Sequence, residues 1–229
     1  MSQLSAAEVH RHARAFRGIP AETLVAWTVR TFPGKAALTL SFGGGGVVLA
    51  HMISRIDKRV PVIFLDTGFH FPETLAFKDR FVAQYGLNLV AVRPLTDPGP
   101  LYRTDPDRCC AIRKVEPMER AIAGYDAWIS GLRRDQADTR ATVELLEYHE
   151  VDGRPIVKAF PLAEWSRADV RRYIDAHGVP YHPLLDRGYT SIGCWPCTRP
   201  TRPGEPERAG RWSGTGKTEC GLHTFTTKR

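Results

Sequence analysis

Five cysteines are the residues of this chain with the clearest chemistry. Cys109 is followed directly by Cys110. Cys194 and Cys197 form a CxxC pair, and Cys220 stands alone near the C-terminus. Four thiolates in two pairs are typical of a zinc site or of an iron–sulfur cluster. Because this leaves one thiol over, the spacing predicts one metal centre and one reactive cysteine.

The neighbours of Cys220 suit a nucleophile. Lys217 and His223 lie within three residues of it in the sequence KTECGLH, and nearby cations favour the thiolate, which is the attacking form. The alternative is an incidental thiol in a non-catalytic nucleotide-binding or RNA-binding protein that has a structural four-cysteine zinc site. The spacing alone leaves zinc and iron–sulfur chemistry open.

The C-terminal residues 187–229 are basic. They hold eight Lys and Arg against three Glu, which supplies +5 of the net charge of +7. Such a segment is often a solvated tail, and some bind nucleic acid. Because its basic residues are interleaved with the cysteines, we favour closure over a small polyanionic substrate and expect no nucleic-acid partner.

The composition, with 42% hydrophobic and 25% charged residues, is that of a globular protein. Residues 1–20 are polar, so we expect no signal peptide. No apolar run reaches the length needed to span a bilayer, so we expect a cytoplasmic protein without a membrane partner. In that reducing compartment, five cysteines favour metal or redox chemistry over disulfides.

Short apolar runs alternate with helical patterns. Buried strands are predicted at residues 36–42, 61–66, 88–93 and 126–131. Helices are predicted at residues 6–17, 21–31, 47–56 and 72–85, and from the cysteine pair to residue 123. This order predicts an α/β fold, in which a parallel twisted sheet carries helices on both faces. A hairpin turning at Asp152-Gly153 and a helix capped by Ser166 and ending before Gly178 follow.

We expect one domain over residues 1–229. Residues 1–33 form an N-terminal helical segment, residues 34–186 a nucleotide-binding core, and residues 187–229 a basic, cysteine-bearing segment that carries the metal centre and the nucleophile.

Three strand ends offer anion or nucleotide contacts. The loop at residues 41–46 (SFGGGG) joins a strand to a helix, so its backbone N–H groups suit a phosphate, although it is not a Walker A loop. Residues 65–68 (LDTG) can contact adenine or ribose, or simply form an Asx turn. Arg133 and Arg134 are placed for phosphate or sulfate, unless one of them pairs with Asp135.

Seven stretches together resemble the assimilatory adenylyl-sulfate reductases, the iron–sulfur branch of the phosphoadenylyl-sulfate reductase family. They are SFGG (41–44), FLDTGFHFPET (64–74), CCAIRKVEP (109–117), SGLRRDQ (130–136), GCWPCTRP (193–200), RAGRW (208–212) and KTECGLH (217–223). The resemblance spans about residues 36–223 and implies a fold related to the adenine-nucleotide alpha-hydrolases.

The resemblance also implies the chemistry. A [4Fe–4S] cluster would be held by Cys109, Cys110, Cys194 and Cys197. Cys220 would attack the sulfur of adenylyl sulfate, AMP would leave, and thioredoxin or glutaredoxin would release sulfite from the sulfonated cysteine, in sulfate assimilation and cysteine biosynthesis. Residues expected to bind the substrate are Ser41, Gly43, Gly44, Leu65, Asp66, Thr67, Gly68, Lys114, Arg133, Arg134, Arg208, Arg211 and His223. A homo-oligomer is left open.

One departure concerns the glycine loop. Related loops often carry polar or acidic residues where this chain has Gly45 and Gly46, so side-chain contacts from these positions are lost. The departure also weakens an ATP-dependent tRNA thiolation enzyme as an alternative. A reductase that uses the 3′-phosphorylated substrate, or both substrates, is the nearer alternative.

Overall fold

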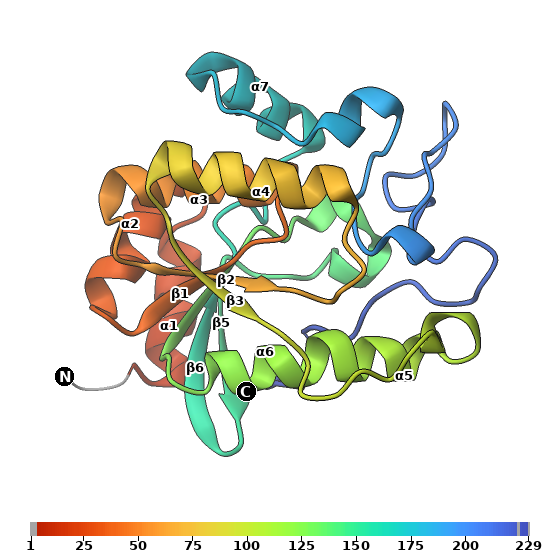
Figure 1. The fold of residues 1–229 in the computed structure, drawn as a ribbon. Helices are drawn as coiled ribbons and strands as arrows, with labels where there is room; N and C mark the ends of the chain where they lie inside the picture. The colour runs from red at the N-terminus through yellow and green to blue at the C-terminus, as the bar shows by residue number, and fades with distance from the viewer. Residues whose placement is uncertain (1–3, 224, 229) are drawn as a thin grey trace.

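One seven-stranded sheet runs through the structure, in the order β3-β2-β1-β4-β6-β5-β7 (Figure 1). The computed structural model describes residues 4–223 and 225–228. The strands are β1 (Ala36–Thr39), β2 (Pro61–Leu65), β3 (Asn88–Val92), β4 (Ala127–Ser130), β5 (Leu146–Val151), β6 (Arg154–Ala159) and β7 (Thr227–Lys228). The five strands from β3 to β6 in this order are parallel, whereas β5 and β7 are antiparallel additions.

Helices cover both faces of the sheet, which confirms the predicted fold class (Figure 1). They are α1 (Ala6–Ala15), α2 (Ala21–Thr31), α3 (Gly44–Ile56), α4 (Pro72–Tyr85), α5 (Pro106–Cys110), α6 (Glu116–Ile122) and α7 (Arg167–His177). Alternate strand residues face opposite sides: Leu38 packs in the larger core with α2 and α3, whereas Ala37 and Trp128 pack with α6. No helix in the described ranges is long and apolar enough to cross a membrane.

Local signals set several element ends as predicted. Ser166 and Asp169 form a reciprocal capping box at the start of α7, and Gly178 ends it in the left-handed conformation with φ 60°. The β5–β6 hairpin turns at Asp152 and Gly153, whose φ angles are 49° and 72°. The hairpin and the capped helix are therefore confirmed.

Two regions differ from the prediction. The helix after β1 begins at Gly44 rather than at residue 47, so most of the glycine run is helical. After the cysteine pair, a single π-helical turn over Ala111–Val115 separates α5 from α6. Such turns are rare and frequently lie at functional sites. The hydrophobic periodicity of the sequence does not predict one here.

His182 joins the 3-10 turn at Pro183–Arg187 to α4. The backbone N–H of Leu184 donates to its Nδ1 at 3.2 Å. The proton therefore lies on Nε2, which is 2.8 Å from Thr74 Oγ1. Burial lowers the pKa of His182 from 6.5 to about 4, since the imidazolium has no room for water here.

This shift makes stability depend on pH. Between about pH 6.5 and about pH 4, the unfolded chain binds a proton that the folded protein rejects, so the free energy of unfolding should fall as pH falls, by up to about 3 kcal/mol. Urea unfolding across this range should give a shallower pH dependence for His182→Asn. His10→Asn, at an exposed residue of α1, is the control. Equal slopes for His182→Asn and the unchanged protein would contradict the assignment.

Candidate active site

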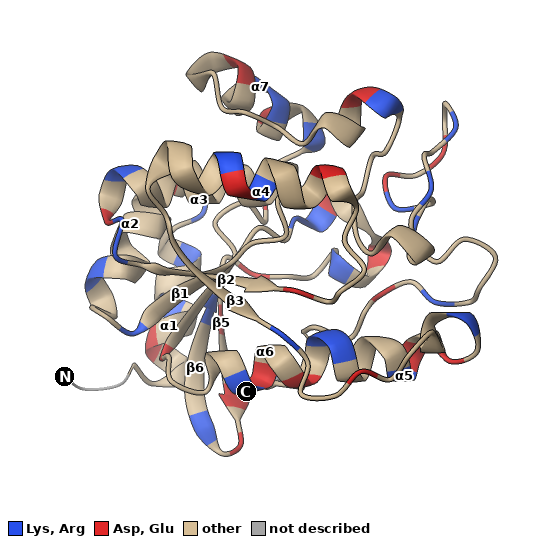
Figure 2. Cartoon of the chain, viewed as in Figure 1, with Lys and Arg blue, Asp and Glu red and all other residues tan. Residues whose placement is uncertain are grey.

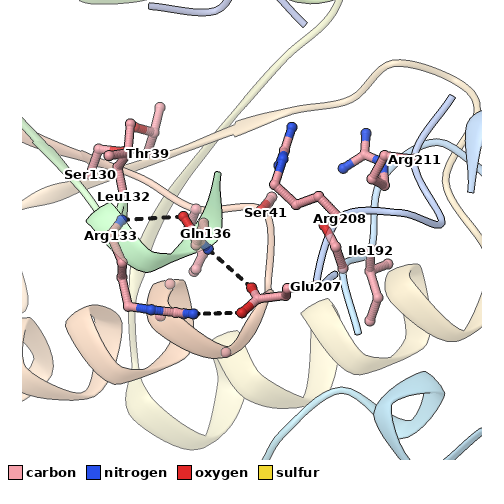
Figure 3. Close-up of a pocket in the computed structure, with 18 of the residues that line it drawn as sticks. Thr39, Ser41, Ser130, Leu132, Arg133, Gln136, Ile192, Glu207, Arg208 and Arg211 are labelled. Atoms are coloured by element: carbon pink, nitrogen blue, oxygen red, sulfur yellow. Dashed lines mark hydrogen bonds and ion pairs between the residues drawn. The ribbon is translucent and has the colours of Figure 1, made fainter. Parts of the chain in front are cut away.

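A cavity of about 430 Å³ opens at the carboxyl ends of β1, β2 and β4. Its floor includes the glycine loop, one wall comes from α7, and the C-terminal segment closes the other side. Figure 3 shows side chains that line the cavity from the glycine loop (Ser41), from the loop after β4 (Arg133) and from the C-terminal segment (Glu207). This is the place where open parallel α/β sheets bind ligands, because the connections of neighbouring strands diverge there.

The glycine loop lines the cavity where β1 leads into α3. Phe42 is buried and takes a left-handed φ of 59°, which turns the chain sharply from β1 into α3. A non-glycine residue in this conformation stores strain of about 1–3 kcal/mol, and such strain is concentrated at functional sites. Gly43 then caps α3, and no side chain bonds its free N–H groups in this cap. These donors are available to a phosphate.

Close backbone packing explains why residue 45 is glycine, whereas a side chain at residue 46 would meet only a movable side chain. A Cβ on Gly45 would lie 2.9 Å from the backbone oxygen of Gly131. A Cβ on Gly46 would lie 2.7 Å from Leu40 Cδ1, which is the mobile end of a side chain. The first contact holds the start of α3 against the end of β4, so glycine at residue 45 is a packing requirement.

The two alanine variants should therefore differ. Alanine is favoured over glycine in a helix by about 1 kcal/mol, so Gly46→Ala should change the free energy of unfolding little. Gly45→Ala should destabilise the protein by about 1–3 kcal/mol, because backbone on both sides must move. Urea unfolding measures both. Equal losses in the two variants would show that the approach to Gly131 is not the constraint.

Cys220 and the expected cations line this cavity together. Lys114, Arg208 and Arg211 all contribute to its wall. All three cations lie over the ring of Trp212: Arg211 Cζ is 4.4 Å, Arg208 Cζ 5.8 Å and Lys114 Nζ 5.9 Å from the ring centroid. Burial opposes the charge of Lys114, but attraction to negative charge on the sulfurs of Cys194 and Cys220 raises the pKa of Lys114 above its usual value.

The two arginines of this group have different surroundings. Arg208 donates to Glu219 and to the carbonyl of Thr218, both at 3.0 Å. Burial and repulsion from Arg140 lower the pKa of Arg208 to about 10, so it stays charged at neutral pH. Arg211 forms no ion pair within the described ranges, and its buried Nε has no partner there. Its charge is therefore free for an anionic ligand.

His223 lies deep in the same wall. Its ring stacks on Trp128 with the centroids 4.7 Å apart, and its Nδ1 has no partner in the described structure. Burial, then repulsion from Lys158 and Arg140, hold the pKa of His223 well below 6.5. The imidazole is therefore neutral, and its Nδ1 is buried without a hydrogen-bond partner among the described residues.

The other four cysteines line a second, smaller cavity beside the first. They are Cys109, Cys110, Cys194 and Cys197. Lys114, Cys194 and Trp212 line both cavities and so form the wall between them. Within the described residues, no three Cys, His, Asp or Glu side chains converge as ligands of a single ion. The four cysteines share the lining of this small cavity.

Ion pairs neutralise much of the basic C-terminal segment. Figure 2 shows acidic bands among its basic ones. Arg199 pairs with Glu205 within the segment, whereas Arg187 pairs with Glu73 on α4. The Arg187 pair and the pairing of β7 with β5 hold the segment against the core, so it is not a solvated tail.

Ten of the thirteen residues expected to bind the substrate line the cavity, and three do not. Asp66 pairs with Arg93 at 2.8 Å and accepts from the N–H of Gly68, which is the Asx-turn alternative. Arg134 turns away to Glu144 and Glu164. The structure thus places Asp66, Gly68 and Arg134 outside the cavity, because each is committed to neighbours elsewhere.

Arg133 does line the cavity, but its charge is already paired. Its guanidinium meets Asp135 at 2.9 Å and Glu207 at 2.7 Å, and only 3% of the side chain is exposed. Sequence analysis missed several lining residues, among them Gln136, Arg140 and Glu207. Gln136 lies in the SGLRRDQ stretch and Arg140 four residues after it. Their acidic partners Glu207 and Glu219 are 71 and 79 positions away, so the sequence does not mark the contacts.

Comparisons with known proteins agree with this geometry. Residues 35–200 match the phosphoadenosine phosphosulfate reductase domain. The chain belongs to this family. The adenosine 5′-phosphosulfate reductase of Streptomyces coelicolor is 44% identical over 221 residues, which cover 93% of this chain and 92% of the relative. The phosphoadenosine 5′-phosphosulfate reductase of Gloeobacter violaceus is 44% identical over 222 residues, covering 92% and 91%. The family predicted from the sequence is confirmed.

A solved structure supports the same placement. The phosphoadenylyl-sulfate reductase of Candida auris, in a phosphate complex, superposes with a TM-score of 0.75 at 32% identity, over 85% of this chain and 97% of that chain. The FMN adenylyltransferase of Candida glabrata has a TM-score of 0.58 at 15% identity, over 93% and 76%. The latter similarity concerns the fold alone.

Proposed function

We propose that this chain reduces adenylyl sulfate to sulfite and AMP, with Cys220 as the nucleophile. One observation carries the proposal: Cys220 shares a single cavity with the glycine loop and with Lys114, Arg208 and Arg211. The curated relatives named for adenosine 5′-phosphosulfate support the choice of substrate. The enzyme would act in the cytoplasm, in sulfate assimilation for cysteine biosynthesis.

The reaction balances with two thiols as the reductant. The Cys220 thiolate attacks the sulfur of the substrate, the bond from sulfur to the bridging phosphate oxygen breaks, and AMP takes that electron pair. Cys220 is left as the sulfonated cysteine, Cys–S–SO₃⁻. One thiolate of a dithiol such as thioredoxin or glutaredoxin then attacks the Cys220 sulfur, and sulfite leaves with the electron pair of the broken S–S bond. The second thiolate attacks the resulting mixed disulfide, so the dithiol becomes a disulfide and Cys220 is restored as a thiolate.

Cations make the first step feasible. A thiolate approaching a sulfate group meets repulsion between like charges, and fixed positive groups lower this barrier because they need no reorganisation. Arg211 has its charge free, and Lys114 lies between Cys220 and the second cavity. His223 lines the same cavity as a neutral imidazole, so it adds no charge of its own beside the substrate. The glycine loop would hold the nucleotide phosphate.

The donor set of the second cavity supports a [4Fe–4S] cluster. Iron–sulfur clusters are held by four thiolates, and the four cysteines other than Cys220 line this one cavity together. The family resemblance favours a cluster over a single zinc. Cys109, Cys110, Cys194 and Cys197 would hold the cluster. When bound, it would supply electrostatic and structural support beside Lys114, since the thiols provide both electrons.

Sulfite release tests the proposal. The anaerobically purified protein should release sulfite from adenylyl sulfate when thioredoxin is supplied, and should prefer it to the 3′-phosphorylated form. Equal turnover of both would make it a dual-specificity enzyme, an outcome consistent with the name of the Gloeobacter relative. No sulfite from either substrate, with the cluster present, would refute the proposed function.

A further inference from the structure

Glu219 precedes Cys220 and places a negative charge beside the cavity that Cys220, Lys114 and Arg211 line. Its carboxylate is held by a bidentate contact from Arg140, whose Nε and Nη2 donate to the two oxygens at 2.8 Å each. Arg208 adds a third contact at 3.0 Å, and Thr139 Oγ1 a fourth at 3.3 Å. Burial alone would raise the pKa of Glu219, but hydrogen bonding and charge from Arg140 keep it below the usual value.

Arg140 connects this carboxylate to the core. Its Nη1 donates to Gln136 Oε1 at 2.6 Å, and the same oxygen accepts the backbone N–H of Arg133 at 3.2 Å. Gln136 Nε2 reaches Glu207 at 3.4 Å (Figure 3). A continuous set of hydrogen bonds thus joins the loop after β4 to the residue beside Cys220, across 79 positions of chain.

We propose that Arg140 is a positioning residue, which places the Cys220 sulfur by holding Glu219. Arg140 neutralises the one carboxylate next to the nucleophile, so this charge does not repel the substrate. Arg140 also ties the residue next to the nucleophile to the loop after β4 through Gln136. That loop packs against the glycine loop, where Gly131 approaches Gly45. A bidentate guanidinium–carboxylate contact fixes direction as well as distance, which lysine cannot do.

The test combines kinetics with thiol labelling, and its kinetic part rests on the proposed function. In Arg140→Gln, kcat should fall by about 10- to 100-fold with KM changed little, because a small displacement of a nucleophile is costly. Arg140→Lys should recover only part of this. Glu219→Gln should show the same fall, and the double variant should cost no more than either single one. Additive losses would show that the two residues act separately and would overturn the proposal.

Labelling does not depend on the substrate. A bulky maleimide, followed by mass spectrometry of the peptide that contains Cys220, should react several-fold faster in Arg140→Gln. Arg187→Gln is the matched control, since it breaks another long-range ion pair, to Glu73, outside the cavity, and should leave labelling and kcat unchanged. A raised KM with unchanged kcat and labelling would make Arg140 a substrate contact instead. If the unchanged protein releases no sulfite, the proposed function fails, while labelling still decides whether Arg140 places Cys220.

Discussion

Serine in place of Cys220 should reduce sulfite release by about a thousandfold or more, because a hydroxyl is a far weaker nucleophile than a thiolate at neutral pH. Cys220 lies outside the four-cysteine cavity, so the variant should keep the visible absorption of the cluster and its affinity for AMP. When the unchanged protein is incubated with adenylyl sulfate without reductant, mass spectrometry should show one sulfonate on the peptide that contains Cys220. The variant should gain none.

Cys197→Ser is the matched comparison for this experiment. It removes a thiol from the second cavity and should lose the visible absorption of the cluster, whereas the thiol of Cys220 stays available to alkylation. The two variants therefore separate loss of the nucleophile from loss of the metal centre. Turnover near the normal rate in Cys220→Ser would contradict the nucleophile assignment, however the cluster behaves.

Local chemistry made much of the fold predictable. The Ser166 capping box and the turn at Asp152-Gly153 depend on residues within a few positions of one another, so the sequence contains the whole signal. Strand β7 has no such signal. Its two residues pair with His149 and Glu150, and that pairing exists only once the C-terminal segment has folded back on the core.

The candidate site also combines residues that the sequence marks and contacts that it does not. Cys220, Lys114 and Arg211 stand in recognisable motifs, and all three line one cavity, as the family resemblance implies. Arg133 and Arg134 are equivalent as sequence, yet one is buried beside the cavity and the other turns away. Their difference is set by Glu207, Glu144 and Glu164, acidic partners that lie well away along the chain and that only the folded structure brings together.

Replacing Arg211 with glutamine should lower kcat/KM by about 10- to 100-fold, which is the range for losing one charge-assisted hydrogen bond to an anion. Because Arg211 forms no ion pair within the described residues, the variant should lose only its contact with the Trp212 ring, about 0.5–1 kcal/mol of the free energy of unfolding. Arg208→Gln should differ, since it also releases Glu219 and the carbonyl of Thr218. Steady-state kinetics and urea unfolding together distinguish the two arginines.

A second variant tests position without removing the charge. A Cβ on Gly193 would overlap the guanidinium of Arg211, which is the flexible end of its side chain and so must shift. Gly193→Ala should therefore lower kcat/KM in the same direction as Arg211→Gln but less, because the cation remains nearby. Gly216→Ala, in the same segment with open space around it, is the control. If Gly193→Ala has no effect while Arg211→Gln does, the long-range field of Arg211 matters and its hydrogen-bond geometry does not.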